Sequence, residues 1–175
     1  MASETVHEGV FARVRVDRVR MPDGEVLDRE VVEQADAAGV VPIFGDGSVM
    51  LLRQYRQPFA TYLLEIPAGK LDREGEDPAA AAARELIEET GYRAERLEHL
   101  VTFRNSAGWT DESTHLYVAT GLTAEGVPDD FHASAEEADM EIVRLPLDEA
   151  VAAVRDGTIT DAKTVIGLLL VGGRF

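Results

Sequence analysis

Three glutamates lie close together in the stretch AAAARELIEETGY at residues 80–92: Glu85, Glu88 and Glu89. On a helix, residues spaced i, i+3 and i+4 fall on one face, so these side chains would share one stripe. Like charges at these spacings destabilise a helix by roughly 0.2–0.5 kcal/mol per pair, and Arg84 offsets only part of that. Carboxylate oxygens are ligands that suit Mg²⁺ and Mn²⁺. The stripe therefore indicates either a divalent-cation site or a solvated acidic face.

The helix that would carry this stripe has clear signals at both ends. Asp77 is a good N-cap, Pro78 suits the first helical position, and Gly91 lies where helices usually stop. We therefore expect a helix over DPAAAAARELIEETG.

Strands are expected on both sides of this helix in the sequence. VFARVRVDRVR and VLDREVVEQ flank the turn MPDGE, which predicts a hairpin over residues 9–34. GVVPIF and SVMLLRQYR, joined by GDG, predict a second hairpin. The later expected strands are LEHLVTFRN, STHLYVATGL and MEIVRL, and the later expected helices are LDEAVAAVRDG and DAKTVIGLLLVG. The order is mixed α and β.

Composition narrows the classes of partner. The chain has 175 residues, enough for one compact unit, and carries a net charge of −16, which disfavours nucleic acid as a partner. The longest apolar run, TVIGLLLVGG, is too short to span a bilayer. The chain has no cysteine, and MASETVHEGV lacks the pattern of a secretory signal. We therefore expect a cytoplasmic protein that does not bind membranes.

RELIEETGY resembles the signature of the Nudix hydrolase family, which reads Gly, five residues, Glu, seven residues, then Arg-Glu-apolar-x-Glu-Glu-x-Gly-apolar. Glu76, the seven residues DPAAAAA and the segment from Arg84 to Tyr92 fall in place. One departure is that six residues, KLDREG, separate Gly69 from Glu76. Surface loops absorb such insertions at little cost.

The resemblance implies a fold, a domain organisation and a metal site. The fold class would be α/β, a Nudix-type α/β/α sandwich with a mixed sheet and an N-terminal β-hairpin appendage. The appendage, residues 1–38, would serve dimerisation, and residues 39–175 would form the hydrolase domain. Mg²⁺ or Mn²⁺ would be bound by Glu85 and Glu89, with Glu88 assisting and the carbonyl of Ala68 completing the site. Arg84 would orient the glutamates.

Outside the signature, LLRQYRQPFATYLLEIPAGKLD resembles the ADP-ribose pyrophosphatase branch, as does SAGWTDE further on. The resemblance implies that Arg56 holds the diphosphate, that Glu65 lies near the terminal ribose and that Glu112 is near the substrate. A solvated Arg56 and a turn-capping Glu65 are the alternatives. Ala107 departs from the branch, which usually has proline there, so the reaction is better specified than the substrate.

A separate carboxylate must take the proton from water, because the signature glutamates would be occupied by metal. In the branch, a glutamate in the acidic loop does so, and counting back from MEIVRL selects Glu136, with Glu137 as its neighbour. The alternative is that this loop is simply solvated.

The activity implied is metal-dependent hydrolysis of ADP-ribose to AMP and ribose 5-phosphate. Another nucleoside diphosphate sugar such as GDP-mannose is an alternative substrate, and a non-catalytic ADP-ribose-binding module is an alternative class. We also expect a homodimer, because an isolated hairpin over residues 9–34 is too small to be stable. By resemblance, Arg29 would pack against the adenine bound to the opposite subunit, and its alternative is an exposed strand arginine.

Overall fold

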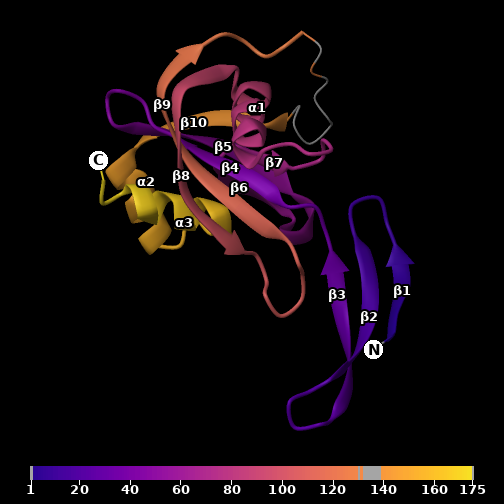
Figure 1. The fold of residues 1–175 in the computed structure, drawn as a ribbon. Helices are drawn as coiled ribbons and strands as arrows, with labels where there is room; N and C mark the ends of the chain where they lie inside the picture. The colour runs from indigo at the N-terminus through magenta and orange to yellow at the C-terminus, as the bar shows by residue number, and fades with distance from the viewer. Residues whose placement is uncertain (1, 130, 132–138, 175) are drawn as a thin grey trace.

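The structure is a computed structural model that describes residues 2–129, 131 and 139–174. An N-terminal sheet stands beside a larger body of two sheets and the helices (Figure 1). The strands are β1 (Ala2–Glu8), β2 (Arg13–Arg20), β3 (Val26–Glu33), β4 (Ala37–Pro42), β5 (Ser48–Arg56), β6 (Thr61–Glu65), β7 (Ala68–Lys70), β8 (Tyr92–Arg104), β9 (Ser113–Ala124) and β10 (Glu141–Pro146). The helices are the short 3₁₀ segment η1 (Gln57–Phe59), α1 (Pro78–Thr90), α2 (Leu147–Arg155) and α3 (Ala162–Val171).

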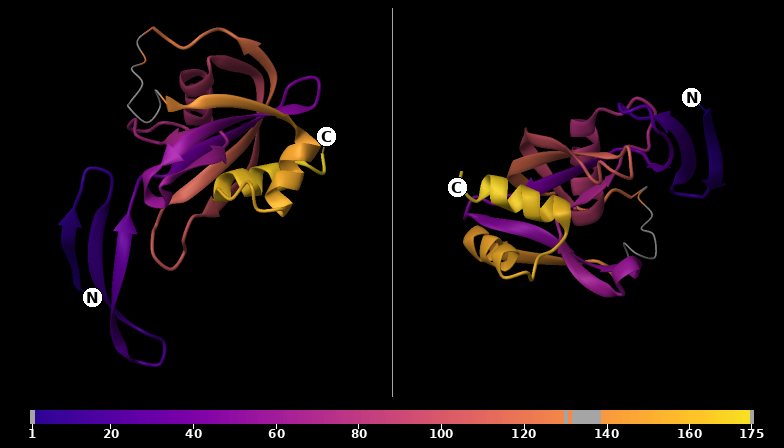
Figure 2. Two further views of the ribbon diagram at one scale, coloured as in Figure 1. Left: turned by 180° about the vertical axis from the view of Figure 1, so that it is seen from behind. Right: turned by 90° about the horizontal axis from the view of Figure 1, so that it is seen from below.

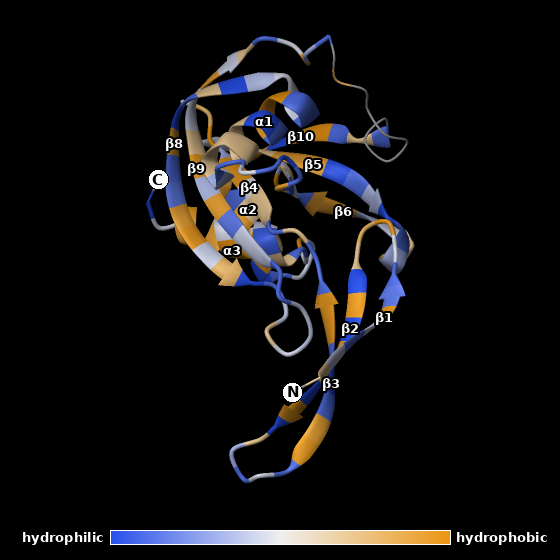
Figure 3. Ribbon diagram, turned by 45° about the vertical axis from the view of Figure 1, so that its right-hand side comes forward, coloured by the Kyte–Doolittle hydropathy of each residue, from blue (hydrophilic) through white to orange (hydrophobic). Residues whose placement is uncertain are grey.

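The N-terminal sheet is antiparallel, in the order β1-β2-β3. The expected hairpin corresponds to β2 and β3, and hydrophobic and hydrophilic residues alternate along most of β2 (Figure 3). The sequence prediction missed β1, whose residues are all exposed and whose register shifts between Thr5 and His7. A strand without a buried face has no hydrophobic alternation by which to recognise it.

The second predicted hairpin is wrong in its pairing. Strands β4 and β5 form and reverse around Gly47, which has a φ of 81°, but they belong to different sheets. Beyond one isolated bridge, Ile43 to Val49, β4 pairs with β7 and β9, and β5 pairs with β6 and β10. Both strands are strongly buried, so their apolar runs are compatible with more than one neighbouring strand. The tight turn reverses the direction of the chain but does not determine which sheet each strand joins.

The body has the layers of an α/β/α sandwich, as expected. Helix α1 covers one face of the mixed sheet β7-β4-β9-β8, and the sheet β10-β5-β6 with α2 and α3 covers the other (Figures 1 and 2). The core on the α1 side is built from small residues such as Ala38, Ala81 and Ala82 around Leu86, which lets the helix approach the sheet closely. The larger core on the other side includes Leu51, Ile66, Leu116, Leu168 and Val171.

The predicted helix over residues 78–90 forms as expected. The Asp77 carboxylate accepts hydrogen bonds from the amides of Ala79 and Ala80, at 2.9 and 3.4 Å. Gly91 ends the helix with a φ of 72°, and its amide donates to the Ile87 carbonyl. No helix in the described part of the chain is long and apolar enough to cross a membrane.

Candidate active site

Arg84 lies among the acidic side chains of α1 and the loop before it. Its guanidinium donates to both carboxylate oxygens of Glu76, at 2.9 and 3.0 Å, and to Glu88 at 2.9 Å. It also contacts Glu85 and donates to the carbonyl of Lys70 at 3.2 Å. One cation thus offsets much of the repulsion between the carboxylates. The extra residue in the loop does not prevent Glu76 from reaching Arg84.

Glu85 is the most buried of the three signature glutamates, with only 8% of its surface exposed. Burial raises the pKa of its carboxyl to about 7, against the opposing effect of Arg84. Its carboxylate lies directly against Gly69 of β7: a Cβ at that position would come within 2.2 Å of the Glu85 carboxyl carbon. The glycine is therefore required for this close approach.

Glu89 also contacts β7, since its carboxylate accepts a hydrogen bond of 3.0 Å from the Ala68 amide. The acidic face of α1 and the main chain of Ala68 and Gly69 thus form one continuous surface. Within the described residues, no three Asp, Glu, His or Cys side chains converge as a preassembled cation site. Glu85 and Glu88 instead form ion pairs with Arg84.

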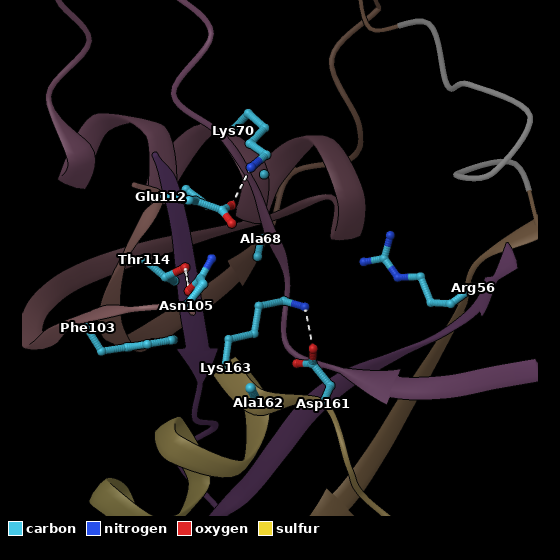
Figure 4. A pocket seen from close by; sticks show the side chains of 12 residues that line it. Arg56, Ala68, Lys70, Phe103, Asn105, Glu112, Thr114, Asp161, Ala162 and Lys163 are labelled. Atoms are coloured by element: carbon cyan, nitrogen blue, oxygen red, sulfur yellow. Dashed lines mark hydrogen bonds and ion pairs between the residues drawn. The ribbon is translucent and has the colours of Figure 1, made fainter. Parts of the chain in front are cut away.

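A cavity of about 360 Å³ lies next to Ala68 and Gly69 (Figure 4). It is lined by Ala37, Arg56, Ala68, Gly69, Lys70, Phe103, Asn105, Glu112, Thr114, Asp161, Ala162 and Lys163. Three of these side chains are basic, in a chain whose net charge is −16. Local cations of this kind are what a phosphate-bearing ligand needs in order to approach an acidic protein.

Arg56 and Lys163 share one buried carboxylate, that of Glu65. Arg56 donates to both oxygens of Glu65 at 2.7 Å, and Lys163 contacts Glu65 and lies 3.1 Å from Asp161. Burial alone would raise the pKa of Glu65, but the two cations outweigh it and hold the pKa at about 2. Glu65 therefore fixes both cations at the edge of the cavity, and the alternative of a turn-capping Glu65 does not hold.

The carboxylate of Glu65 is expected to stabilise the fold strongly. Its side chain is 3% exposed, so Glu65→Gln, which removes the charge that neutralises Arg56 and Lys163, should lower the free energy of unfolding by about 3 kcal/mol. Because the folded pKa is depressed, the contribution is present above pH 4.5 and is lost as pH falls toward about 2. Urea unfolding across that range should show a steeper loss of stability in the parent than in the variant, which keeps only the contributions of other carboxylates such as Glu76 and Asp46.

Glu141→Gln is the matched control for this prediction. The pair of Arg53 and Glu141 is exposed, at 40% and 66%, and such pairs contribute about 0–1 kcal/mol. A Glu65→Gln variant no less stable than the Glu141→Gln variant would contradict the stabilising role of the buried carboxylate.

Comparison with known families agrees with this geometry. The model of the NUDIX domain matches residues 33–166, and the model of the nucleoside diphosphate sugar hydrolase N-terminal domain matches residues 2–32. The chain belongs to the Nudix family. The chain is therefore a Nudix pyrophosphohydrolase, and Nudix hydrolases generally need divalent cations.

Individual relatives of this Nudix chain match nearly all of it. It is 41% identical to an ADP-ribose pyrophosphatase of Mycobacterium tuberculosis, over 98% of this chain and 81% of that protein. It is 39% identical to a methanol dehydrogenase activator of Bacillus methanolicus, over 95% and 88%. A crystal structure of an ADP compounds hydrolase superposes with a TM-score of 0.84 at 26% identity, covering 99% of this chain and 91% of that one.

The residues present fit the divalent cation of a Nudix hydrolase. The donors are hard carboxylate oxygens, and the buried Glu85 has a carboxyl that a nearby cation would ionise. The close approach of Gly69 to Glu85 and the hydrogen bond of Ala68 to Glu89 bring a backbone segment to the same place. A cation would compete with Arg84 for the glutamates.

The structure brings together most of the residues that the Nudix resemblance singled out. Arg56, Ala68 and Glu112 line the cavity, and Glu85 and Glu89 contact the β7 residues that border it. Arg29 does not line it and is exposed on β3. Glu136 and Glu137 lie outside the described residues.

Sequence analysis missed Lys70, Lys163, Asp161 and Asn105. The signal for the two lysines is compositional: they are the only lysines in the sequence, while arginine supplies every other basic side chain besides histidine. Because lysine occurs only twice in the sequence, its rarity could have singled out Lys70 and Lys163 before their place at the Nudix site was known.

Proposed function

We propose that the protein hydrolyses the diphosphate bond of ADP-ribose to give AMP and ribose 5-phosphate, with Mg²⁺ or Mn²⁺ as its cofactor. The observation that carries the proposal is the adjacency of two charged surfaces across β7. The acidic face of α1 suits divalent cations, and the cavity with Arg56 and Lys163 suits a diphosphate. The 41% sequence identity to an ADP-ribose pyrophosphatase favours ADP-ribose as the substrate over other nucleoside diphosphate derivatives. A cytoplasmic location is part of the proposal.

Each residue has a role in this reaction. Glu85, Glu89 and the carbonyl of Ala68 would hold the cation, with Glu88 assisting, and Arg84 would orient the glutamates. A bound divalent cation neutralises the diphosphate and lowers the pKa of water. Arg56, which Glu65 holds at the edge of the cavity, binds the diphosphate as a fixed positive charge. Glu65 lies near the terminal ribose, and Glu112 lies near the substrate at the cavity.

Proton transfer falls to Glu136 in this proposal. The carboxylate accepts a proton as the water oxygen forms its bond to phosphorus, while the bridging P–O bond breaks and the leaving phosphate takes the electron pair. The glutamates of α1 are unsuited to this step because they are committed to the cation.

A substrate panel tests the function. Released nucleotide is measured for ADP-ribose, ADP-glucose and GDP-mannose, with Mg²⁺ and with EDTA. Fastest turnover of ADP-ribose, lost in EDTA, is the expected result. If GDP-mannose is turned over faster, GDP-mannose and not ADP-ribose is the substrate. If ADP-ribose binds but is not turned over in Mg²⁺ or Mn²⁺, the protein is a non-catalytic binding module.

The proposal includes a homodimer in which the N-terminal region, residues 1–38, completes the site of the partner. The N-terminal sheet stands to one side of its own body (Figure 1), and the turn between β1 and β2 carries an exposed Val10 and Phe11. Arg29 would then stack on the adenine held by the opposite subunit, through its guanidinium plane.

Arg29→Ala is expected to raise KM for ADP-ribose more than it lowers kcat. Adenine lies far from the scissile bond, so its contacts hold the ground and transition states about equally. Steady-state kinetics give the two constants, and Arg18→Ala, another exposed arginine of the same sheet, is the control. Sedimentation of the purified chain tests the assembly, and a monomer with full activity would exclude the shared site.

A further inference from the structure

The N-terminal sheet is joined to the loop between β8 and β9 by hydrogen bonds of the Val32 main chain. The Val32 amide donates to the Trp109 carbonyl at 2.9 Å, and the Thr110 hydroxyl donates to the Val32 carbonyl at 2.7 Å. Val32 is 5% exposed, whereas most of β3 is accessible. The end of β3 is thus fixed to the loop that leads into Glu112.

Lys70 ties the same two segments to β7. Its ammonium donates at 3.0 Å to the side-chain carbonyl of Gln34, at 3.0 Å to the main-chain carbonyl of Ala35, and also to the Glu112 carboxylate (Figure 4 shows the contact with Glu112). Gln34 and Ala35 follow directly after β3. Three acceptors from two distant segments therefore meet at one side chain.

The chemistry of the lysine suits this junction. An ammonium has three donors around one nitrogen, and all three have acceptors here. A planar guanidinium presents its donors as a fork, which fits one carboxylate better than three separate oxygens. Lysine occurs at this position in a chain that otherwise relies on arginine, and the neighbouring Gly69 lies against Glu85.

We infer that Lys70 is a positioning residue, which couples the placement of the N-terminal sheet to the placement of Glu112. The inference rests on the proposed substrate role of Glu112. In the structure, the coupling runs from Gln34 through the Lys70 ammonium to the Glu112 carboxylate, whose side chain is only 14% exposed. A contact that moves the N-terminal sheet would in this way alter where the Glu112 carboxylate lies relative to the substrate.

Lys70→Met tests the coupling first without substrate. Trp109 is the only tryptophan and lies in the tethered loop, so its fluorescence reports on that loop alone. Loss of the tether should increase acrylamide quenching of Trp109. Arg18→Met, which removes an exposed cation from the same sheet, should leave quenching unchanged. If Lys70→Met does not fold, Gln34→Ala removes one acceptor without touching the backbone and should also increase quenching.

Kinetics test the consequence for the site. Lys70→Met should raise KM for ADP-ribose about tenfold, the effect of losing one hydrogen bond to a charged group, with kcat nearly unchanged. Lys70→Arg, which keeps the charge but not the three-acceptor geometry, should restore part of the loss.

A double-mutant cycle separates positioning from direct contact with substrate. The effects of Gln34→Ala and Glu112→Gln on KM should be non-additive when Lys70 is present and additive in the Lys70→Met background. Additivity in both backgrounds, or unchanged KM and quenching in a folded Lys70→Met variant, would overturn the inference. Failure of the parent to hydrolyse ADP-ribose would instead overturn the proposed function, while the quenching measurement still decides the role of Lys70.

Discussion

Replacing Glu89 by glutamine is expected to lower kcat by several orders of magnitude while leaving the fold intact. The amide of glutamine is a weaker ligand for a divalent cation than a carboxylate, and the cation provides several kcal/mol of transition-state stabilisation. Glutamine can still accept the hydrogen bond from the Ala68 amide. In EDTA the variant should melt no lower than the parent, because removing one like charge from α1 relieves repulsion.

Thermal melts in EDTA and in Mg²⁺ give this prediction a readout besides activity. The parent should melt higher in Mg²⁺, by linkage to binding, and the variant should show a smaller increase. Glu98→Gln is the control, since Glu98 is 61% exposed and pairs with Arg174 on the surface. If the melting temperature of the parent does not depend on metal and the Glu89→Gln variant is fully active, the proposed divalent-cation site on α1 is wrong.

Glu136→Gln is expected to reduce the chemical step by about 10²–10⁴, the usual range for a lost general base, while substrate still binds. Glutamine keeps the size of the side chain but cannot accept the proton from water. Single-turnover kinetics separate the chemical step from binding and product release.

Glu137→Gln is the matched control for Glu136. Both residues lie outside the described part of the structure, so their order rests on the sequence alone. Full activity in the Glu136 variant with loss in the Glu137 variant would shift the assignment by one residue, and full activity in both would place the base elsewhere.

Prediction from the sequence was accurate where the determinants are local. Helix α1 was predicted with its caps because Asp77 and Gly91 act within a few residues of themselves. The acidic stripe was predicted for the same reason, since helical periodicity alone places Glu85, Glu88 and Glu89 together.

Prediction failed where distant segments choose their partners. The pairing of β4 and β5 was wrong because burial makes their apolar runs compatible with several neighbours. Lys163 reaches Glu65 across 98 positions of the sequence, and no local pattern around either residue indicates that contact. The two lysines were identifiable only through their rarity.

Strand β1 constrains how another chain can join the N-terminal sheet. As an outer strand of the sheet, β1 has backbone N–H and C=O groups on one side that no neighbouring strand pairs with. Such groups can pair with a strand of another chain and so lead to aggregation. The register shift between Thr5 and His7 interrupts this row of groups, and Glu4 and Glu8 add charge along it. Such irregular, charged borders are how natural sheets resist edge-to-edge polymerisation. In the proposed homodimer, a second subunit should therefore lie against a broad face of this sheet and not along the edge formed by β1.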